Sequence, residues 1–69
     1  MFGNNLKKLR NARKITQAQL AEELELSVFT IGKYENNRRR PDFEILIKIA
    51  DYFEVSVDYL LGRTTSLND

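Results

Sequence analysis

Residues 16–40 hold most of the side chains that could bind a ligand, and nearly all of these are hydrogen-bond donors. They are Thr16, Gln17, Ser27, Thr30, Lys33, Asn36, Arg38, Arg39 and Arg40. Hydroxyl, amide, ammonium and guanidinium groups of this kind bind phosphate oxygens and the acceptor atoms on base edges. The pattern therefore favours the binding of a polyanion over covalent chemistry on a substrate.

The residues that usually carry catalysis are missing. The sequence contains no histidine and no cysteine, which removes the commonest general base, the commonest metal ligand, disulfides and thiolate metal sites. A Ser–His–Asp set cannot form, no glycine-rich phosphate loop is present, and paired carboxylates occur only as neighbours on helix surfaces. We therefore expect a binding protein that is not an enzyme and has no metal and no cofactor.

Charge is distributed unevenly along a chain whose net charge is only +1. Residues 1–40 contain nine basic and four acidic side chains, whereas residues 41–69 contain two basic and six acidic ones. This asymmetry predicts one face for a polyanion and another turned away from it. No stretch approaches the ~20 apolar residues that cross a bilayer, and the N-terminus lacks the apolar core of a signal peptide. We expect a cytoplasmic protein with no membrane contact.

Sixty-nine residues allow one domain, and apolar residues recur throughout at the spacing of an α-helix. The sequence predicts an all-α fold, a compact five-helix bundle over residues 1–62 that is followed by a polar tail at 63–69. The expected helices begin near Asn4, Thr16, Val28, Asp42 and Ser56, and they end near Arg13, Leu24, Asn36, Phe53 and Gly62.

Each expected helix has an apolar stripe that could face a common core. In chain order the stripes are Phe2, Leu6 and Leu9; Leu20, Ala21 and Leu24; Ile31 and Tyr34; Phe43, Leu46, Ile49, Ala50 and Phe53; and Val57, Leu60 and Leu61. The apolar residues left over in the C-terminal half are Ile45, Ile47, Tyr52, Tyr59 and Leu67. They could form the seam of a homodimer, or they could be ordinary exposed side chains.

Short signals mark the ends of the central helices. "TQAQ" fits a capping box, in which the Thr16 hydroxyl accepts from the Gln19 amide and the Gln19 side chain reaches back. Ser27 is a good N-cap for the following helix, and Asn37 is suited to a left-handed exit behind it. Two short helices joined by a turn of roughly three or four residues form a helix-turn-helix.

These segments resemble a known family, the Cro and phage-repressor type of helix-turn-helix domain, also called the XRE family. The resemblance covers about Leu6 to Gly62 and rests on "LKKLRNARKITQAQLAEELELS", "YENNRRRPDFEILIKIADYF" and "VSVDYLLG". It implies a lambda-repressor-like bundle that binds operator DNA, commonly as a dimer on an inverted repeat, with its third helix in the major groove. Glu25 and Asn37 stand where the family usually has glycine.

The resemblance implies that the front and outer face of the third helix read base edges. These residues are Ser27, Val28, Phe29, Thr30 and Lys33. Lys33 could donate to guanine, and Val28 and Phe29 could contact thymine methyl groups. An exposed Val–Phe pair is also what a protein-binding patch looks like. The alternative function is therefore a protein-binding module, anti-repressor or antitoxin-like, that docks on another regulator through Val28, Phe29 and Gly32.

A second set of residues is expected at DNA phosphates, beside the reading helix. It comprises Thr16, Gln17, Asn36, Arg38, Arg39 and Arg40, with Lys7, Lys8, Arg13 and Lys14 as weaker candidates. Gln17 lies at the positive start of a helix, where free amides can hold a phosphate, and the resemblance assigns a glutamine at this position that role. The alternative for the arginine run and for Gln17 is that these side chains are simply exposed to solvent and bind nothing.

The resemblance also implies an ion pair between Arg10 on the first helix and Glu35 at the end of the third, which would fix the reading helix against the scaffold. The expected partners are a double-stranded DNA operator, a second copy of the chain and, in the alternative reading, a protein regulator. The sequence is compatible with repressor or activator action, and with a longer regulator that carries a further domain.

Overall fold

The computed structural model describes residues 2–65, and these residues form helices and turns with no β-strand among them. The helices are α1 (Phe2–Ala12), α2 (Gln17–Leu24), α3 (Val28–Glu35), α4 (Phe43–Phe53) and α5 (Val57–Leu60). The predicted all-α fold with a helix-turn-helix is therefore confirmed. The first helix begins and ends slightly earlier than the sequence suggested, and the fifth is a single turn.

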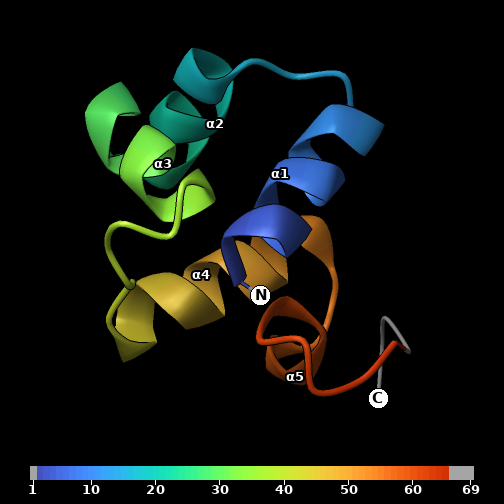
Figure 1. Ribbon diagram of the computed structural model, residues 1–69. Coiled ribbons are helices and arrows are strands. Elements are labelled where there is room, and N and C mark those ends of the chain that lie inside the picture. The colour runs from blue at the N-terminus through green and yellow to red at the C-terminus, as the bar shows by residue number, and fades with distance from the viewer. Residues whose placement is uncertain (1, 66–69) are drawn as a thin grey trace.

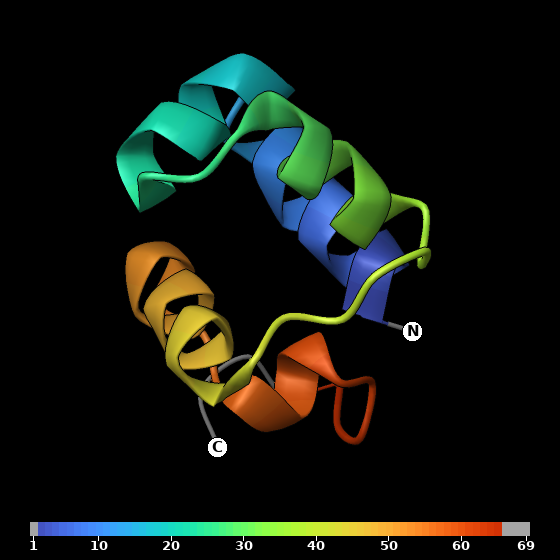
Figure 2. The same ribbon diagram turned by 90° about the vertical axis from the view of Figure 1, so that its left-hand side faces the viewer.

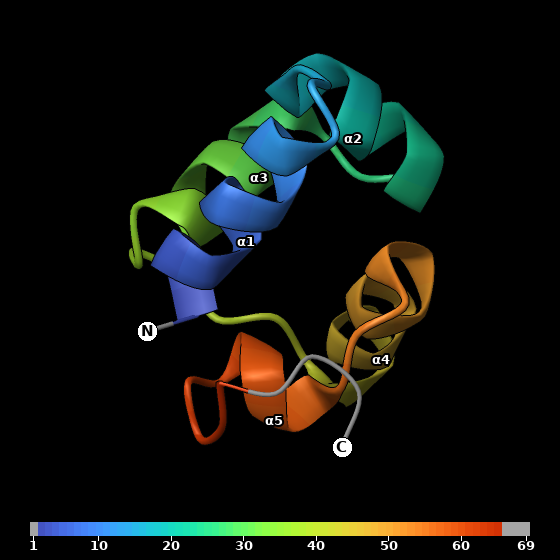
Figure 3. The same ribbon diagram turned by 90° about the vertical axis from the view of Figure 1, so that its right-hand side faces the viewer.

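The helices are arranged so that α3 lies on the outside of the bundle. Figure 2 shows α3 in front of α1, and Figure 3, from the opposite side, shows α1 in front of α3. α2 lies beside these two helices at one end of the molecule, whereas α4 and α5 lie at the other end (Figure 1). One side of α3 is thus packed on its neighbours, and the other side is exposed to solvent.

The core draws on all five helices. Its buried apolar residues are Leu6, Leu20, Ala21, Leu24, Ile31, Tyr34, Leu46, Ile49, Ala50, Phe53 and Leu60. Tyr34 is the largest fully buried side chain, and its ring meets that of Phe2 edge to face at 6.0 Å between centroids. Burial raises the pKa of the Tyr34 phenol, so this side chain stays neutral and anchors α3 in the core.

Two residues of the expected core stripes are exposed, and the prediction was wrong for both. Phe43 is 83% exposed and Leu61 is 45% exposed. Helical side chains lean over the preceding turn, and Phe43 is the first residue of α4, so no earlier turn of this helix lies beneath its side chain. Leu60 is fully buried, and the next residue in a helical turn points about 100° away.

The residues of the expected dimer seam differ in exposure. Ile45 and Tyr52 are partly buried against the core, and Tyr59 is half-buried, so each exposes only part of its side chain. The guanidinium of Arg13 lies 5.3 Å from the centroid of the Tyr52 ring and covers it from the α1–α2 turn. Ile47 is exposed as expected, and Leu67 lies outside the described residues.

Local signals predicted the starts of α2, α3, α4 and α5 correctly. Thr16 and Gln19 form the capping box in full, with 3.0 Å from the Gln19 amide to Thr16 Oγ1 and 2.8 Å from the Thr16 amide to Gln19 Oε1. Ser27, Asp42 and Ser56 each accept a hydrogen bond from the backbone three residues later. These caps fix where α2, α3, α4 and α5 begin.

α2 and α4 end in the same backbone conformation. Glu25 and Glu54 both adopt left-handed backbone, with φ of 58° and 57°. The amide after each donates back across the last helical turn, from Leu26 to the Ala21 carbonyl at 2.8 Å and from Val55 to the Ala50 carbonyl at 3.0 Å. This is the hydrogen-bond pattern of a Schellman motif, which glycine normally fills because a Cβ costs about 1–2 kcal/mol there.

Replacing Glu54 with glycine should therefore raise the free energy of unfolding. The expected net gain is roughly 0.5–1 kcal/mol, because the greater flexibility of glycine in the unfolded chain offsets part of the relieved strain. Within residues 2–65 the Glu54 side chain makes only an exposed ion pair to Arg13, at 4.0 Å, and such a pair contributes little. Urea unfolding measures the change. Glu23→Gly, at an exposed position in the last turn of α2, is the matched control and should lower stability, by up to about 1 kcal/mol, because its backbone is right-handed helix. A loss in both variants would show that the φ of Glu54 is not strained.

Candidate nucleic-acid interface

The outer face of α3 carries the side chains that the core does not use. Ile31 and Tyr34 are buried, whereas Val28 is 40% exposed and Phe29 is 78% exposed. Lys33 is also exposed. A helix can sort its residues this way because positions three or four apart share a face. The exposed face of α3 therefore combines two apolar side chains with one ammonium group.

A hollow of about 370 Å³ lies along this face and joins α3 to the start of α2 and to the linker after α3. Its lining residues are Gln17, Val28, Phe29, Gly32, Lys33, Asn36 and Arg38. The lining has two cations, two amides and no carboxylate. Six of the residues predicted for base or phosphate contact thus meet in one place, and the charge of that place suits an anion.

Ser27 and Thr30 flank this hollow without lining it, and both hydroxyls are already engaged. The Ser27 hydroxyl accepts from the Thr30 amide at 3.1 Å, and the two hydroxyl oxygens are 2.9 Å apart. Thr16 is similarly held in its capping box. The first role of these three residues is to define helix starts. Any ligand contact by them must be compatible with that role.

Gln17 is held by a side chain at the far end of the motif. Its Nε2 donates to Glu35 Oε1 at 3.1 Å, and the residue is only half-buried. An ideal Cβ built on Gly32 would lie 3.9 Å from Gln17 Oε1, so the amide sits directly against α3. Gln17 keeps one side-chain N–H and its backbone amide at the start of α2, and both are suitable donors for an anion.

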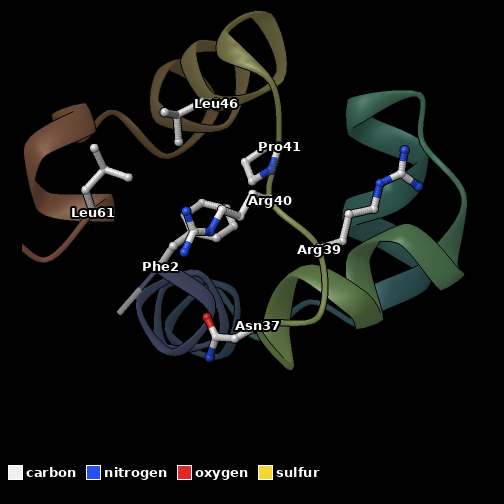
Figure 4. A pocket seen from close by; sticks show the side chains of 7 residues that line it. All are labelled: Phe2, Asn37, Arg39, Arg40, Pro41, Leu46 and Leu61. Atoms are coloured by element: carbon white, nitrogen blue, oxygen red, sulfur yellow. The ribbon is translucent and has the colours of Figure 1, made fainter.

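The three consecutive arginines of the linker are divided between two sites. Arg38 lines the hollow beside α3. Arg39 and Arg40 border a second hollow, between the start of α1 and helices α4 and α5, but Figure 4 shows only Arg40 projecting among Phe2, Leu46 and Leu61. Arg39 extends away from that hollow in the direction of α2 and α3 (Figure 4). The structure therefore does not bring all three guanidinium groups to the α3 face.

Arg10 and Glu35 form a bidentate ion pair that joins α1 to the end of α3. Arg10 Nε lies 2.6 Å from Glu35 Oε2, and Arg10 Nη2 lies 3.1 Å from Glu35 Oε1. Arg10 Nη1 also donates to the Ile15 carbonyl at 2.8 Å. The hydrogen bonds to Glu35 raise the pKa of Arg10, and the two side chains are 12% and 2% exposed. The pair sets the position of α3 relative to α1.

Comparison with protein families identifies this arrangement. The family model described as helix-turn-helix matches residues 6–60, which is most of the chain. The chain belongs to the helix-turn-helix family. The resemblance of the sequence to the Cro and phage-repressor type is thereby confirmed.

Relatives of this helix-turn-helix chain carry the names of transcription regulators. The cryptic phage CTXphi transcriptional repressor RstR of Vibrio cholerae is 46% identical over 59 residues, which cover 81% of this chain and 53% of that protein. The regulator ImmR of Bacillus subtilis is 38% identical over 62 residues, which cover 90% of this chain and 49% of that protein. The chain thus spans about half the length of these curated relatives.

Solved structures agree with the family. The P22 c2 repressor, crystallised in complex with a synthetic operator, superposes with a TM-score of 0.87 at 28% identity, over 93% of this chain and 97% of that one. The solution structure of the DNA-binding domain of the same repressor gives a TM-score of 0.81 at 30% identity, over 88% and 80% of the two chains. In the described part of our chain, no helix is long and apolar enough to cross a membrane.

One structural contact of this helix-turn-helix domain was missed at the sequence level. Gly3 is buried in the first turn of α1, and its amide donates to Asn37 Oδ1 at 3.0 Å. Asn37 has a φ of 59°, as the sequence suggested, and its side chain thus ties the linker after α3 to α1. The signal was a glycine in an otherwise helical segment, which lowers helix propensity and often marks a close approach.

Proposed function

We propose that this helix-turn-helix domain binds double-stranded DNA in a sequence-specific way and regulates transcription, as a repressor of phage or bacterial type. The observation that carries the proposal is the hollow along α3, which has two cations, two amides, two exposed apolar side chains and no carboxylate. α3 would enter the major groove, as the likeness to a repressor solved with operator DNA supports. Such a regulator would act by binding, without catalysis, in the cytoplasm.

Different residues in and around the hollow would contact bases and phosphates. Lys33 donates to guanine O6 or N7, and Val28 and Phe29 contact thymine methyl groups. Ser27 and Thr30 lie at the front of α3 and contact bases where their capping bonds allow. The phosphate set is Thr16, Gln17, Asn36, Arg38, Arg39 and Arg40, with Arg38 the best-placed cation because it shares the hollow with Lys33.

We propose a homodimer on an inverted repeat, in which two copies of α3 lie about 34 Å apart in successive turns of the major groove. Phe43 and Ile47 support a subunit contact, because both are exposed and they lie one turn apart on α4. Selection of bound sequences from random duplex DNA at moderate salt tests the proposal, with sedimentation of the same sample. Recovery of an inverted repeat and a two-subunit mass is expected; enrichment of no sequence would refute specific binding.

Substitution at Lys33 and at Arg38 should have different consequences. Lys33→Ala should relax the preference at one base pair, worth about 1–3 kcal/mol of discrimination. Arg38→Ala should weaken all sequences alike and reduce the slope of log affinity against log salt by about 0.9 for each phosphate that is no longer neutralised. Fluorescence anisotropy on matched and single-mismatch duplexes, at several salt concentrations, separates the two effects. The same sequence-independent loss in both variants would contradict the division of roles.

Gly32→Ala separates a structural role of Gly32 from a role at the interface. The new methyl group would meet only Gln17 Oε1, at an ordinary 3.9 Å, and alanine is favoured over glycine in a helix by about 1 kcal/mol. Stability should therefore rise, while DNA affinity should fall because the methyl group intrudes on the hollow. Urea unfolding and anisotropy measure the two quantities. Unchanged affinity would mean that DNA does not approach α3 at Gly32.

The second candidate function is docking on a protein regulator, and the exposure of Phe29 is the observation that favours it. Phe29→Asp distinguishes the two proposals. If α3 binds DNA, the variant loses affinity for the selected duplex because a carboxylate faces the phosphates. If α3 binds a protein, the parent chain has no measurable affinity for DNA even at low salt.

A further inference from the structure

The second hollow is built from four separate parts of the chain, and of its lining residues only Arg39 and Arg40 also belong to the proposed phosphate set. It measures about 320 Å³ and is lined by Phe2, Asn37, Arg39, Arg40, Pro41, Leu46 and Leu61. No residue is shared with the hollow beside α3. Figure 4 shows Phe2, Arg40, Pro41, Leu46 and Leu61 around it, whereas Arg39 is directed away. Its size lies at the lower end of the range for small-molecule pockets.

The floor of this hollow is apolar and held in place. Leu46 is 8% exposed and belongs to the core, and the ring of Phe2 is fixed by its edge contact with Tyr34. Pro41 restricts the linker that forms one wall, because its ring fixes φ. Leu61 closes the opposite side and remains substantially exposed. A ligand would therefore gain apolar contacts without first having to order the site.

The charged side chains around this floor are both cations, Arg39 and Arg40. Asn37 Oδ1 accepts from the Gly3 amide, and Figure 4 shows the Asn37 amide nitrogen directed away from Arg40. The guanidinium group of Arg40 has no hydrogen bond or ion pair with any of residues 2–65, and it projects among Phe2, Leu46 and Leu61 (Figure 4). No carboxylate lines the hollow. The matching ligand must supply acceptor atoms and a negative charge beside an apolar body.

A second copy of the chain does not meet this requirement. In a two-fold symmetric contact with the hollow on the symmetry axis, two hollows would face each other. The charged residues of each lining are Arg39 and Arg40 alone, and pairing the linings would bring like charges together. The composition of the lining favours a separate anion.

We propose that this hollow binds a small organic carboxylate with an apolar body. The carboxylate pairs with the Arg40 guanidinium, and the apolar body lies on Phe2, Leu46 and Leu61. The two hollows share no lining residue, and binding of a small carboxylate can be measured without DNA, so the proposal does not rest on DNA binding.

The test is a titration of the ¹⁵N-labelled chain with octanoate, below the concentration at which it forms micelles. We expect saturable shifts of backbone amide resonances near Asn37, Arg40, Leu46 and Leu61. Acetate, which has the charge without the apolar body, and octyltrimethylammonium, which has the body with the opposite charge, should give no saturable shifts at these residues. Arg40→Gln should raise the dissociation constant roughly tenfold, because a charge-assisted hydrogen bond is removed.

Arg38→Gln is the matched control, since it removes the same charge from the other hollow and should leave octanoate binding unchanged. Equal binding of octyltrimethylammonium, or equal affinity of Arg40→Gln and the parent chain, would overturn the proposal. Sedimentation of the free chain is a further measurement: a dimer in which the Arg40 amide becomes protected from exchange would show that a second copy covers the hollow. Tight binding of an acidic peptide with no binding of octanoate would point to a protein ligand instead.

Discussion

Glu35→Ala should lower the free energy of unfolding by about 3 kcal/mol, because it removes one partner of a largely buried ion pair. The carboxylate that receives two bonds from Arg10 and one from Gln17 disappears, and the guanidinium group keeps only the Ile15 carbonyl as an acceptor. Arg10 retains 12% exposure, so some hydration remains and the lower end of the usual range for such losses applies.

Urea unfolding of the parent chain and the variant measures this loss. Glu22→Ala is the matched control, since Glu22 is exposed on α2 and should change stability by less than about 0.5 kcal/mol. The double variant Arg10→Met with Glu35→Leu should recover much of the stability, because apolar replacement of both partners leaves no stranded charge. A loss below about 1 kcal/mol in Glu35→Ala would place the pair among exposed ion pairs of little energetic weight.

The elements that sequence reasoning placed well are those set by local interactions. The Thr16 capping box and the Ser27 cap involve residues three positions apart, so their hydrogen bonds follow from the sequence pattern. The outward face of α3 followed in the same way, since assigning Ile31 and Tyr34 to the core leaves Val28, Phe29 and Lys33 outside. Such predictions need only the period of a helix.

The elements that were misplaced depend on where helices end and what lies opposite. Phe43 has the right spacing for the core stripe of α4. Spacing alone does not show that the side chain of the first helical residue stays exposed. Tyr52 was taken as outward, and it is covered by Arg13 from a turn 39 positions earlier. Glu54 gave no sign of left-handed backbone because glutamate rarely adopts it.

In the candidate site, too, the local features could be predicted and the contacts between distant segments could not. The sequence places three arginines after α3, and the path of the linker separates Arg38 from Arg40. The bond from Gln17 to Glu35 joins residues 18 positions apart and could not be read from either helix alone. Which donors remain free for a ligand is therefore a property of the packed bundle. The sequence indicates only which donors exist.

Gly3→Ala should destabilise the fold by about 3 kcal/mol, at the upper end of the usual cost of overpacking. A Cβ at this position would lie 2.5 Å from the Tyr34 carbonyl oxygen, 2.7 Å from Asn37 Oδ1 and 2.8 Å from the Glu35 carbonyl oxygen. Two of these atoms are backbone at the end of α3 and cannot rotate away. The start of α1 must therefore move, which also breaks the bond from the Gly3 amide to Asn37.

Urea unfolding again gives the magnitude, and Asn4→Ala is the control, because Asn4 is exposed in the same turn of α1 and should change stability little. The double variant Gly3→Ala with Asn37→Gly tests how much of the loss comes from the Asn37 side chain. It removes one of the three clashes and relaxes the left-handed backbone, yet both carbonyl contacts remain, so it should restore less than half of the loss. Full recovery would mean that the Asn37 side chain alone opposes a methyl group at position 3, and that α1 and α3 approach less closely than their contact at Gly3 indicates.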